Sequence, residues 1–69
     1  MGNTENRKRR IEIIKNNILK VIERDKVVSY EKMIAFCMYN FGISRRDARD
    51  EINAVIAFEE LKKEGDFIK

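Results

Sequence analysis

The segment that decides the fold is Phe41-Gly42-Ile43-Ser44-Arg45-Arg46-Asp47-Ala48-Arg49-Asp50-Glu51-Ile52-Asn53. Gly42 is free to adopt a left-handed conformation and so to end a preceding helix. Ser44 is suited to cap the next helix, with Asp47 three residues later in the position that completes a capping box. The segment therefore predicts two helices joined by a very short turn.

The helix that starts at Ser44 is predicted to have two unlike faces. At about 100° per residue, Ala48, Ile52 and Val55 fall on one side. The adjoining face carries hydrogen-bond donors, which are the side chains of Arg45, Arg46, Arg49 and Asn53. One face is suited to pack on the rest of the chain, and the other is suited to present donors to a partner.

Length and composition narrow the class of protein. A chain of 69 residues makes one domain, and at this size only about 60% of the unfolded surface becomes buried. Cys37 is the only cysteine and there is no histidine, so neither an internal disulfide nor a metal site is expected, and no cofactor is predicted. The domain is therefore expected to gain support from a second subunit or from well-formed helices.

The distribution of charge is uneven along the chain. The first 26 residues hold eight Lys/Arg against four Asp/Glu, whereas the last 19 hold three against five. The basic cluster Arg7, Lys8, Arg9 and Arg10 is suited to contact phosphate, and a solvated helix start is an equally good explanation. Because basic residues at a helix N-terminus oppose the helix dipole, their presence there favours a function.

The first helix is predicted from about Asn6 to Arg24, after a disordered stretch 1–5 and within a single domain 6–69. Its apolar residues recur at helical spacing, and they are Ile11, Ile14, Ile18, Val21 and Ile22. Ile13 and Leu19 lie off this stripe. They are candidates for a dimer interface, although packing between two other helices of the same chain would explain them equally well.

The rest of the chain predicts two further helices and two short strands. Val27-Val28 form a β-branched pair that suits a strand, and Ser29 is suited to cap a helix over 30–41. That helix is apolar on nearly every side, so it is expected in the middle of the core, with Cys37 as a small buried hydrophobe. The helix from Ser44 is expected to bend or break near Phe58.

The turn signal Gly65-Asp66 precedes the apolar pair Phe67-Ile68, which is predicted to lie beside Val27-Val28 as an antiparallel ribbon. The fold class is therefore mostly α, a three-helix helix-turn-helix core with a minimal two-strand β-ribbon.

This pattern resembles the winged helix-turn-helix DNA-binding domain over about residues 11–68. That family has a Gly-Ile/Val-Ser turn, an alanine four residues after the serine, and a leucine and a glycine before the wing. The matching residues are Gly42, Ile43, Ser44, Ala48, Leu61 and Gly65. The resemblance implies that the helix from Ser44 enters the major groove, where its early residues read bases. Small basic chains of this kind also look like the minimal DNA-binding proteins of archaeal viruses and plasmids.

Site residues follow from the chemistry of the donors. Arg45 and Arg49 are predicted to contact bases, since a guanidinium pairs bidentately with guanine O6 and N7, and Asn53 is predicted to pair with adenine N6 and N7. Phosphate contacts are predicted for Arg7, Lys8, Arg9, Arg10, Ser44 and Arg46. Asp50 opposes this role unless it pairs with an arginine or points sideways. Because the chain stops at Lys69, a full wing with its second outer strand is not expected.

The sequence thus predicts an intracellular, cytoplasmic transcriptional regulator that binds double-stranded DNA sequence-specifically as a homodimer. Two recognition helices would then lie about 34–36 Å apart. The alternative is a small helical protein–protein interaction module. An enzyme with a small-molecule substrate is not expected, because there is no nucleophile–base pair, Gly-rich phosphate loop or metal-ligand spacing. No membrane partner is expected, because no apolar run approaches the ~20 residues that a span requires.

Overall fold

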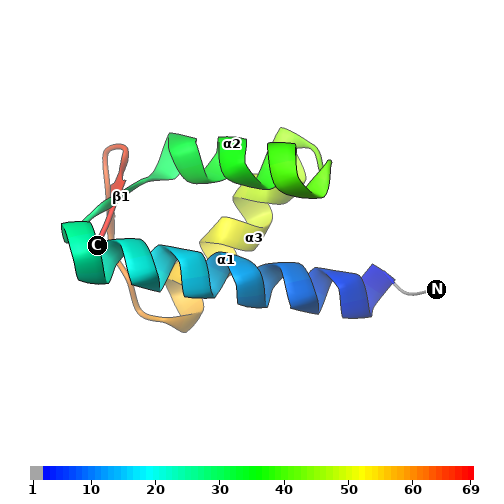
Figure 1. Cartoon of the computed structure of the whole chain (residues 1–69), viewed down its shortest axis with the longest axis horizontal. Helices are drawn as coiled ribbons and strands as arrows, with labels where there is room; N and C mark the ends of the chain where they lie inside the picture. Colours follow the sequence, from blue (N-terminus) through cyan, green and yellow to red (C-terminus); the bar gives the residue numbers. More distant parts are fainter. Residues whose placement is uncertain (1–2) are drawn as a thin grey trace.

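Three helices and a small sheet make up the fold of the computed structural model, which describes residues 3–69 (Figure 1). The elements in order are α1 (Asn3–Asp25), β1 (Val28–Ser29), α2 (Tyr30–Phe41), α3 (Arg45–Phe58), β2 (Lys63–Glu64) and β3 (Phe67–Ile68). The mostly α class with a helix-turn-helix core is confirmed. The stretch 1–5 predicted to be disordered lies in part outside the described residues, and α1 begins at Asn3, three residues before the predicted start.

The longest element is α1, whose 23 residues span about 34 Å at 1.5 Å per residue. In Figure 1, α2 lies above α1, and α3 runs from the end of α2 down behind α1. Ile14 and Ile18 of α1 are fully buried, as the helical spacing predicted. None of the helices within residues 3–69 combines the length and the apolar character needed to cross a lipid bilayer.

The turn between α2 and α3 has the predicted caps. Gly42 takes a left-handed conformation with φ 64° and donates its N–H to Met38 O at 3.0 Å. Ser44 is extended, and its Oγ accepts from the Asp47 N–H at 3.1 Å. Ala48 then follows with no exposed surface, packed in the core. Local residue choices therefore set the angle at which α3 leaves α2.

The core gathers one face of each helix and one residue from each of two strands. Its buried apolar residues are Ile14, Ile18, Val28, Tyr30, Met33, Ile34, Cys37, Ala48, Ile52, Val55 and Ile68. The predicted packing side of α3 is confirmed. The prediction that α2 lies in the middle of the core is wrong, because one side of the helix faces solvent and Met38 on that side is 39% exposed. Cys37 is buried as expected, and its burial raises the pKa of the thiol to about 11.

The break predicted near Phe58 is confirmed, since α3 ends there and Glu60 turns to φ 54°. Because α3 ends at Phe58, the residues after it are available to form the strands β2 and β3. β3 pairs antiparallel with β1, as predicted, with Val28 opposite Ile68 and Ser29 opposite Phe67. The strand β1 begins one residue later than the predicted Val27-Val28. β3 also pairs with β2 through Lys63 opposite Ile68.

The sheet therefore has three strands in the order β1-β3-β2, so the two-strand ribbon was an underestimate. The expectation that the second outer strand has no room is wrong as well. Gly65, with φ 60°, allows a tight turn that consumes few residues. Lys62 and Lys69 then exchange both backbone hydrogen bonds, at 2.9 and 2.8 Å, and extend the β2–β3 ladder.

Candidate nucleic-acid interface

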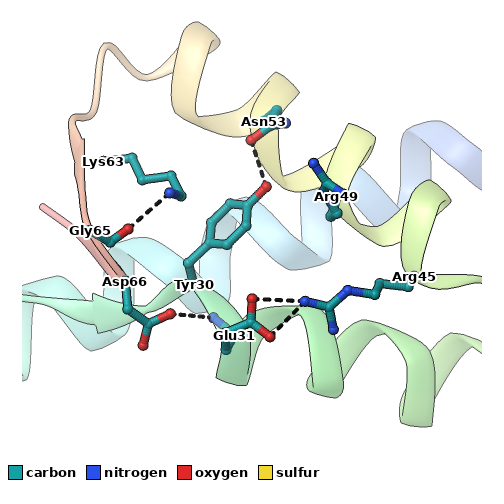
Figure 2. A pocket seen from close by; sticks show the side chains of 8 residues that line it. All are labelled: Tyr30, Glu31, Arg45, Arg49, Asn53, Lys63, Gly65 and Asp66. Carbon is teal, nitrogen blue, oxygen red and sulfur yellow. Dashed lines mark hydrogen bonds and ion pairs between the residues drawn. The ribbon is translucent and has the colours of Figure 1, made fainter.

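A shallow hollow of about 630 Å³ lies between α3, the start of α2 and the turn that joins β2 to β3. We term it the α3 hollow, and Figure 2 shows the side chains that line it. They belong to Tyr30, Glu31, Arg45, Arg49, Asn53, Lys63, Gly65 and Asp66. All three residues predicted to contact bases thus line one surface, and the sheet contributes to it.

Arg45 is paired with a carboxylate in this structure. Its Nη2 donates to both carboxylate oxygens of Glu31 at 2.8 Å. The two side chains are 54% and 56% exposed, and an ion pair so open to water contributes only about 0–1 kcal/mol. Arg45 is therefore held in place weakly and can exchange Glu31 for another acceptor.

Asn53 in the middle of α3 is hydrogen-bonded to Tyr30, the first residue of α2. The Tyr30 hydroxyl donates to Asn53 Oδ1 at 3.0 Å. The Tyr30 ring is only 8% exposed, and Lys63 Nζ lies 4.7 Å from the ring centroid, within the range of a cation–π contact. Tyr30 thus connects α3, α2 and the strand β2.

Asp66 fastens the β2–β3 turn to the start of α2. Its carboxylate accepts from Ser29 Oγ at 2.6 Å and from the Glu31 N–H at 3.0 Å, while its carbonyl accepts from the Tyr30 N–H at 2.6 Å. The Ser29 hydroxyl, followed by the Glu31 amide, lowers the pKa of Asp66. Ser29 meanwhile caps α2 by accepting from the Lys32 N–H, so the helix start and the turn form one hydrogen-bonded unit.

The exposed side of α3 carries both arginines and a carboxylate. Within the described residues, no carboxylate lies at ion-pair distance from Arg46 or Arg49, and both side chains are exposed. At about 100° per residue, Asp50 lies about 140° from Arg45 and about 40° from Arg46 around α3, and it is exposed outside the hollow. The sideways arrangement that the DNA-binding hypothesis requires of Asp50 therefore stays a prediction.

Arg10 occupies a different environment from the rest of the basic cluster. Its Nε lies 3.1 and 3.2 Å from the two Glu51 oxygens, and its Nη2 lies 2.7 Å from Oε2. Glu51 is only 2% exposed and holds the pKa of Arg10 above its ordinary value. Arg10 therefore joins α1 to α3, and its predicted phosphate contact would require this pair to break. Arg7, Lys8 and Arg9 are exposed.

The other predicted site residues are placed as follows. Ser44 is exposed at the N-terminus of α3. Ile13 is 43% exposed, whereas Leu19 is half-buried. Ile13 and Leu19 lie about 120° apart around α1, on opposite sides of its packing stripe.

Five residues that line the hollow were not predicted as site residues: Tyr30, Glu31, Lys63, Gly65 and Asp66. Their only sequence signal was the turn at Gly65-Asp66, which gives no indication that it closes on α2. Comparison of the chain with protein-family models, with curated proteins and with solved structures gave no match. The arrangement of donors around the α3 hollow is therefore the basis for a functional proposal.

Proposed function

We propose that the chain binds double-stranded DNA sequence-specifically, with α3 entering the major groove. The observation that carries this proposal is the shared exposed surface of Arg45, Arg49 and Asn53 beside the β2–β3 turn. An α-helix fits the major groove, which is about 12 Å wide, and base edges there accept hydrogen bonds from arginine and asparagine. The winged helix-turn-helix resemblance of the sequence supports the same geometry.

Phosphate contacts are assigned to exposed cations around this surface. Arg46 stands on α3 beside the donors, and Arg7, Lys8 and Arg9 stand on the first turns of α1. Ser44 lies where the backbone amides of the α3 N-terminus are available to a phosphate. These contacts fix the position of the protein on the duplex and carry no sequence information. Arg10 is left out of this set because Glu51 holds it.

The proposal includes a homodimer that regulates transcription inside the cell. With 14 residues, α3 is about 21 Å long and covers only one short half-site. A twofold dimer would place two such helices about 34–36 Å apart in successive grooves. The exposed Ile13 side of α1 is the candidate interface. Equilibrium sedimentation is expected to show a dimer, and a monomer at high micromolar concentration would remove this part of the proposal.

The main test is binding to a mixed-sequence duplex at several salt concentrations. Each phosphate contact is expected to add about 0.9 to the slope of log affinity against log salt. Arg9→Ala is expected to weaken binding to all sequences alike, whereas Arg49→Ala is expected to weaken specific binding more than non-specific binding. Lys20→Ala, which removes an exposed cation about three turns further along α1 than Arg9, is the matched control and is expected to change little.

A protein–protein interaction module is the second candidate, and two exposed aromatic side chains favour it. Phe58 at the end of α3 is 83% exposed, and Tyr39 of α2 is 89% exposed. Aromatic residues of this kind are enriched at protein interfaces. If neither DNA nor RNA binds at low salt, the arginines only solvate the surface and a protein partner is the better explanation.

A further inference from the structure

We infer that the homodimer forms through a groove between α1 and the end of α3, with Phe58 of each copy seated in the groove of the other. This inference rests on the proposed homodimer, and it moves the contact from the Ile13 side of α1 to the opposite side. The groove has a volume of about 350 Å³, and we term it the Phe58 groove. Its lining side chains belong to Lys8, Ile11, Glu12, Lys15, Phe58 and Glu59.

Phe58 is the apolar anchor of this groove. It is the last residue of α3, which emerges on the lower side of α1 in Figure 1, and its side chain is 83% exposed. A phenylalanine removes about 150–250 Å² from water when it becomes buried. That area is roughly a quarter to two fifths of the 600 Å² per partner that a small stable interface needs. The half-buried Ile11 and the aliphatic stem of Lys15 lie beside Phe58 and add apolar surface.

The charges of the Phe58 groove balance, which suits contact with a second copy. Two cations, Lys8 and Lys15, line it together with two carboxylates, Glu12 and Glu59. Lys15 already pairs with Glu12 at 2.9 Å. In a twofold contact each patch meets itself, so a patch of one sign repels its copy, whereas a balanced patch does not. A chain of net charge +3 can therefore associate through this groove without bringing like charges together.

Charge is less favourable on the Ile13 side of α1. Ile13 lines a separate hollow whose charged residues are Arg9 and Arg10. Arg10 is paired with Glu51, but a twofold contact there would bring the exposed Arg9 side chains of the two copies together. At about 100° per residue, Ile13 lies about 160° around α1 from Ile11. The two surfaces are therefore separate and can be altered one at a time.

A contact through Phe58 leaves the proposed DNA-binding surface free. Phe58 follows Arg49 by nine residues, so the two side chains lie about 180° apart around α3. Arg45, at the start of α3, is about 20 Å from Phe58 along the helix axis. Two copies joined near Phe58 can therefore hold their Arg45 residues up to about 40 Å apart. That span includes the distance of about 34–36 Å between successive major grooves.

Equilibrium sedimentation of the full chain without DNA tests this inference. Phe58→Ala is expected to raise the dissociation constant of the dimer about 30-fold or more, which is the effect of losing one interface hot spot. Because Phe58 is exposed, circular dichroism should show the same helical fold in the variant. Two controls are expected to leave the dissociation constant unchanged: Tyr39→Ala, at an exposed aromatic residue of α2, and Ile13→Ala, on the other side of α1.

A charge reversal gives a second measurement, which decides if Phe58→Ala fails to fold. Glu59→Lys changes the net charge of the groove lining from zero to +2. It is expected to raise the dissociation constant about twofold to fivefold at low salt, and added salt should remove the effect. Glu60→Lys makes the same change of net charge one residue outside the groove and should have a smaller effect.

Three results would overturn the inference while the homodimer stands. They are a folded Phe58→Ala variant that dimerises like the parent, a dimer that Ile13→Ala dissociates, and equal effects of Glu59→Lys and Glu60→Lys. A parent chain that is monomeric at high micromolar concentration overturns the homodimer and the inference together. The measurement contains no DNA, so failure of DNA binding is a separate result.

Discussion

Two Arg–Glu pairs of similar length lie in very different surroundings. Arg10 Nη2 and Glu51 Oε2 are 2.7 Å apart between α1 and α3, and Arg45 Nη2 and Glu31 Oε1 are 2.8 Å apart between α3 and α2. The Glu51 side chain is 2% exposed, whereas that of Glu31 is 56% exposed. Bond length alone therefore does not tell the two pairs apart.

Burial of the acid decides what each arginine can do. A buried carboxylate that loses its cation is left as an uncompensated charge, at a cost of about 3–5 kcal/mol. An exposed pair costs about 0–1 kcal/mol to separate. The Arg10–Glu51 pair therefore stabilises the fold and is costly to break. Arg45 can leave Glu31 for another acceptor at little cost. The two arginines therefore differ because the acid of one pair is buried and the acid of the other is exposed to solvent.

The largest expected effect is the loss of Arg10. Arg10→Ala should lower the free energy of unfolding by about 3 kcal/mol, because Glu51 stays buried without a partner. For 69 residues the total stability is about 3–10 kcal/mol, so the variant should be close to unfolding. Urea titration followed by circular dichroism measures the change.

Two variants control this result. Arg9→Ala removes an adjacent exposed cation and should change the urea midpoint little. Replacement of both partners, Arg10→Met with Glu51→Leu, should recover most of the loss because no buried charge remains. An Arg10→Ala protein as stable as the parent would show that the buried carboxylate does not need its cation. The two ion pairs would then not differ in their contribution to stability.

Arg45→Ala is expected to change stability little and duplex affinity strongly, the reverse of Arg10→Ala. Stability should change by less than about 1 kcal/mol, as for other exposed pairs, whereas affinity for a duplex selected from a random library should fall by about 1–3 kcal/mol if Arg45 contacts a base. Fluorescence anisotropy with the selected and a scrambled duplex measures both affinities. An equal loss on the two duplexes would assign Arg45 to phosphate instead.

Glu31→Gln is expected to change duplex affinity by a smaller amount than Arg45→Ala. The carboxylate competes with DNA for Arg45, so its removal should raise duplex affinity about twofold to fivefold, equivalent to the 0–1 kcal/mol of an exposed pair. Glu23→Gln, an exposed acid of α1, is the matched control for net charge. Equal gains in the two variants would mean that general repulsion is relieved, and that Glu31 has no specific hold on Arg45.

The features that were predictable from the sequence depend on residues close together in the chain. The turn from Gly42 to Ser44 and the packing side of α3 follow from capping and from helical spacing. The end of α3 at Phe58 was also predicted, because Glu59 falls on the side of the helix that Ile52 and Val55 occupy while Phe58 falls elsewhere. These features are local, so residue type and spacing are enough to determine them.

The features that were missed depend on distant pairs. Arg10 and Glu51 are separated by 41 residues, and Tyr30 and Asn53 by 23, so no spacing rule connects them. The burial of α2 was overestimated because an apolar sequence does not reveal which sides are covered, as the exposed Met38 illustrates. The strand β2 was missed because Lys63 and Glu64 are polar and exposed, and only their pairing with β3 makes them a strand.

The smallest effect concerns Asp66, a carboxylate whose partners are uncharged. The Ser29 hydroxyl and the Glu31 amide lower its pKa, so folding favours its ionised form. Its contribution to stability is therefore complete above the ordinary pKa of about 3.9 and is lost as pH falls through the lowered value. Asp66→Asn should remove this part of the pH dependence, measured as the urea midpoint between pH 2 and 6.

The control for Asp66 is an acid whose lowered pKa has an ionic cause. Asp25, an exposed residue paired with Arg24 at 3.0 Å, should lose its contribution when salt is added, because screening weakens exposed charge pairs. The contribution of Asp66 should persist at 1 M salt, since hydrogen bonds from a hydroxyl and an amide supply it. If both disappear together, Asp66 is held by nearby lysines rather than by the start of α2, and the β2–β3 turn is as loosely attached as the Arg45–Glu31 pair.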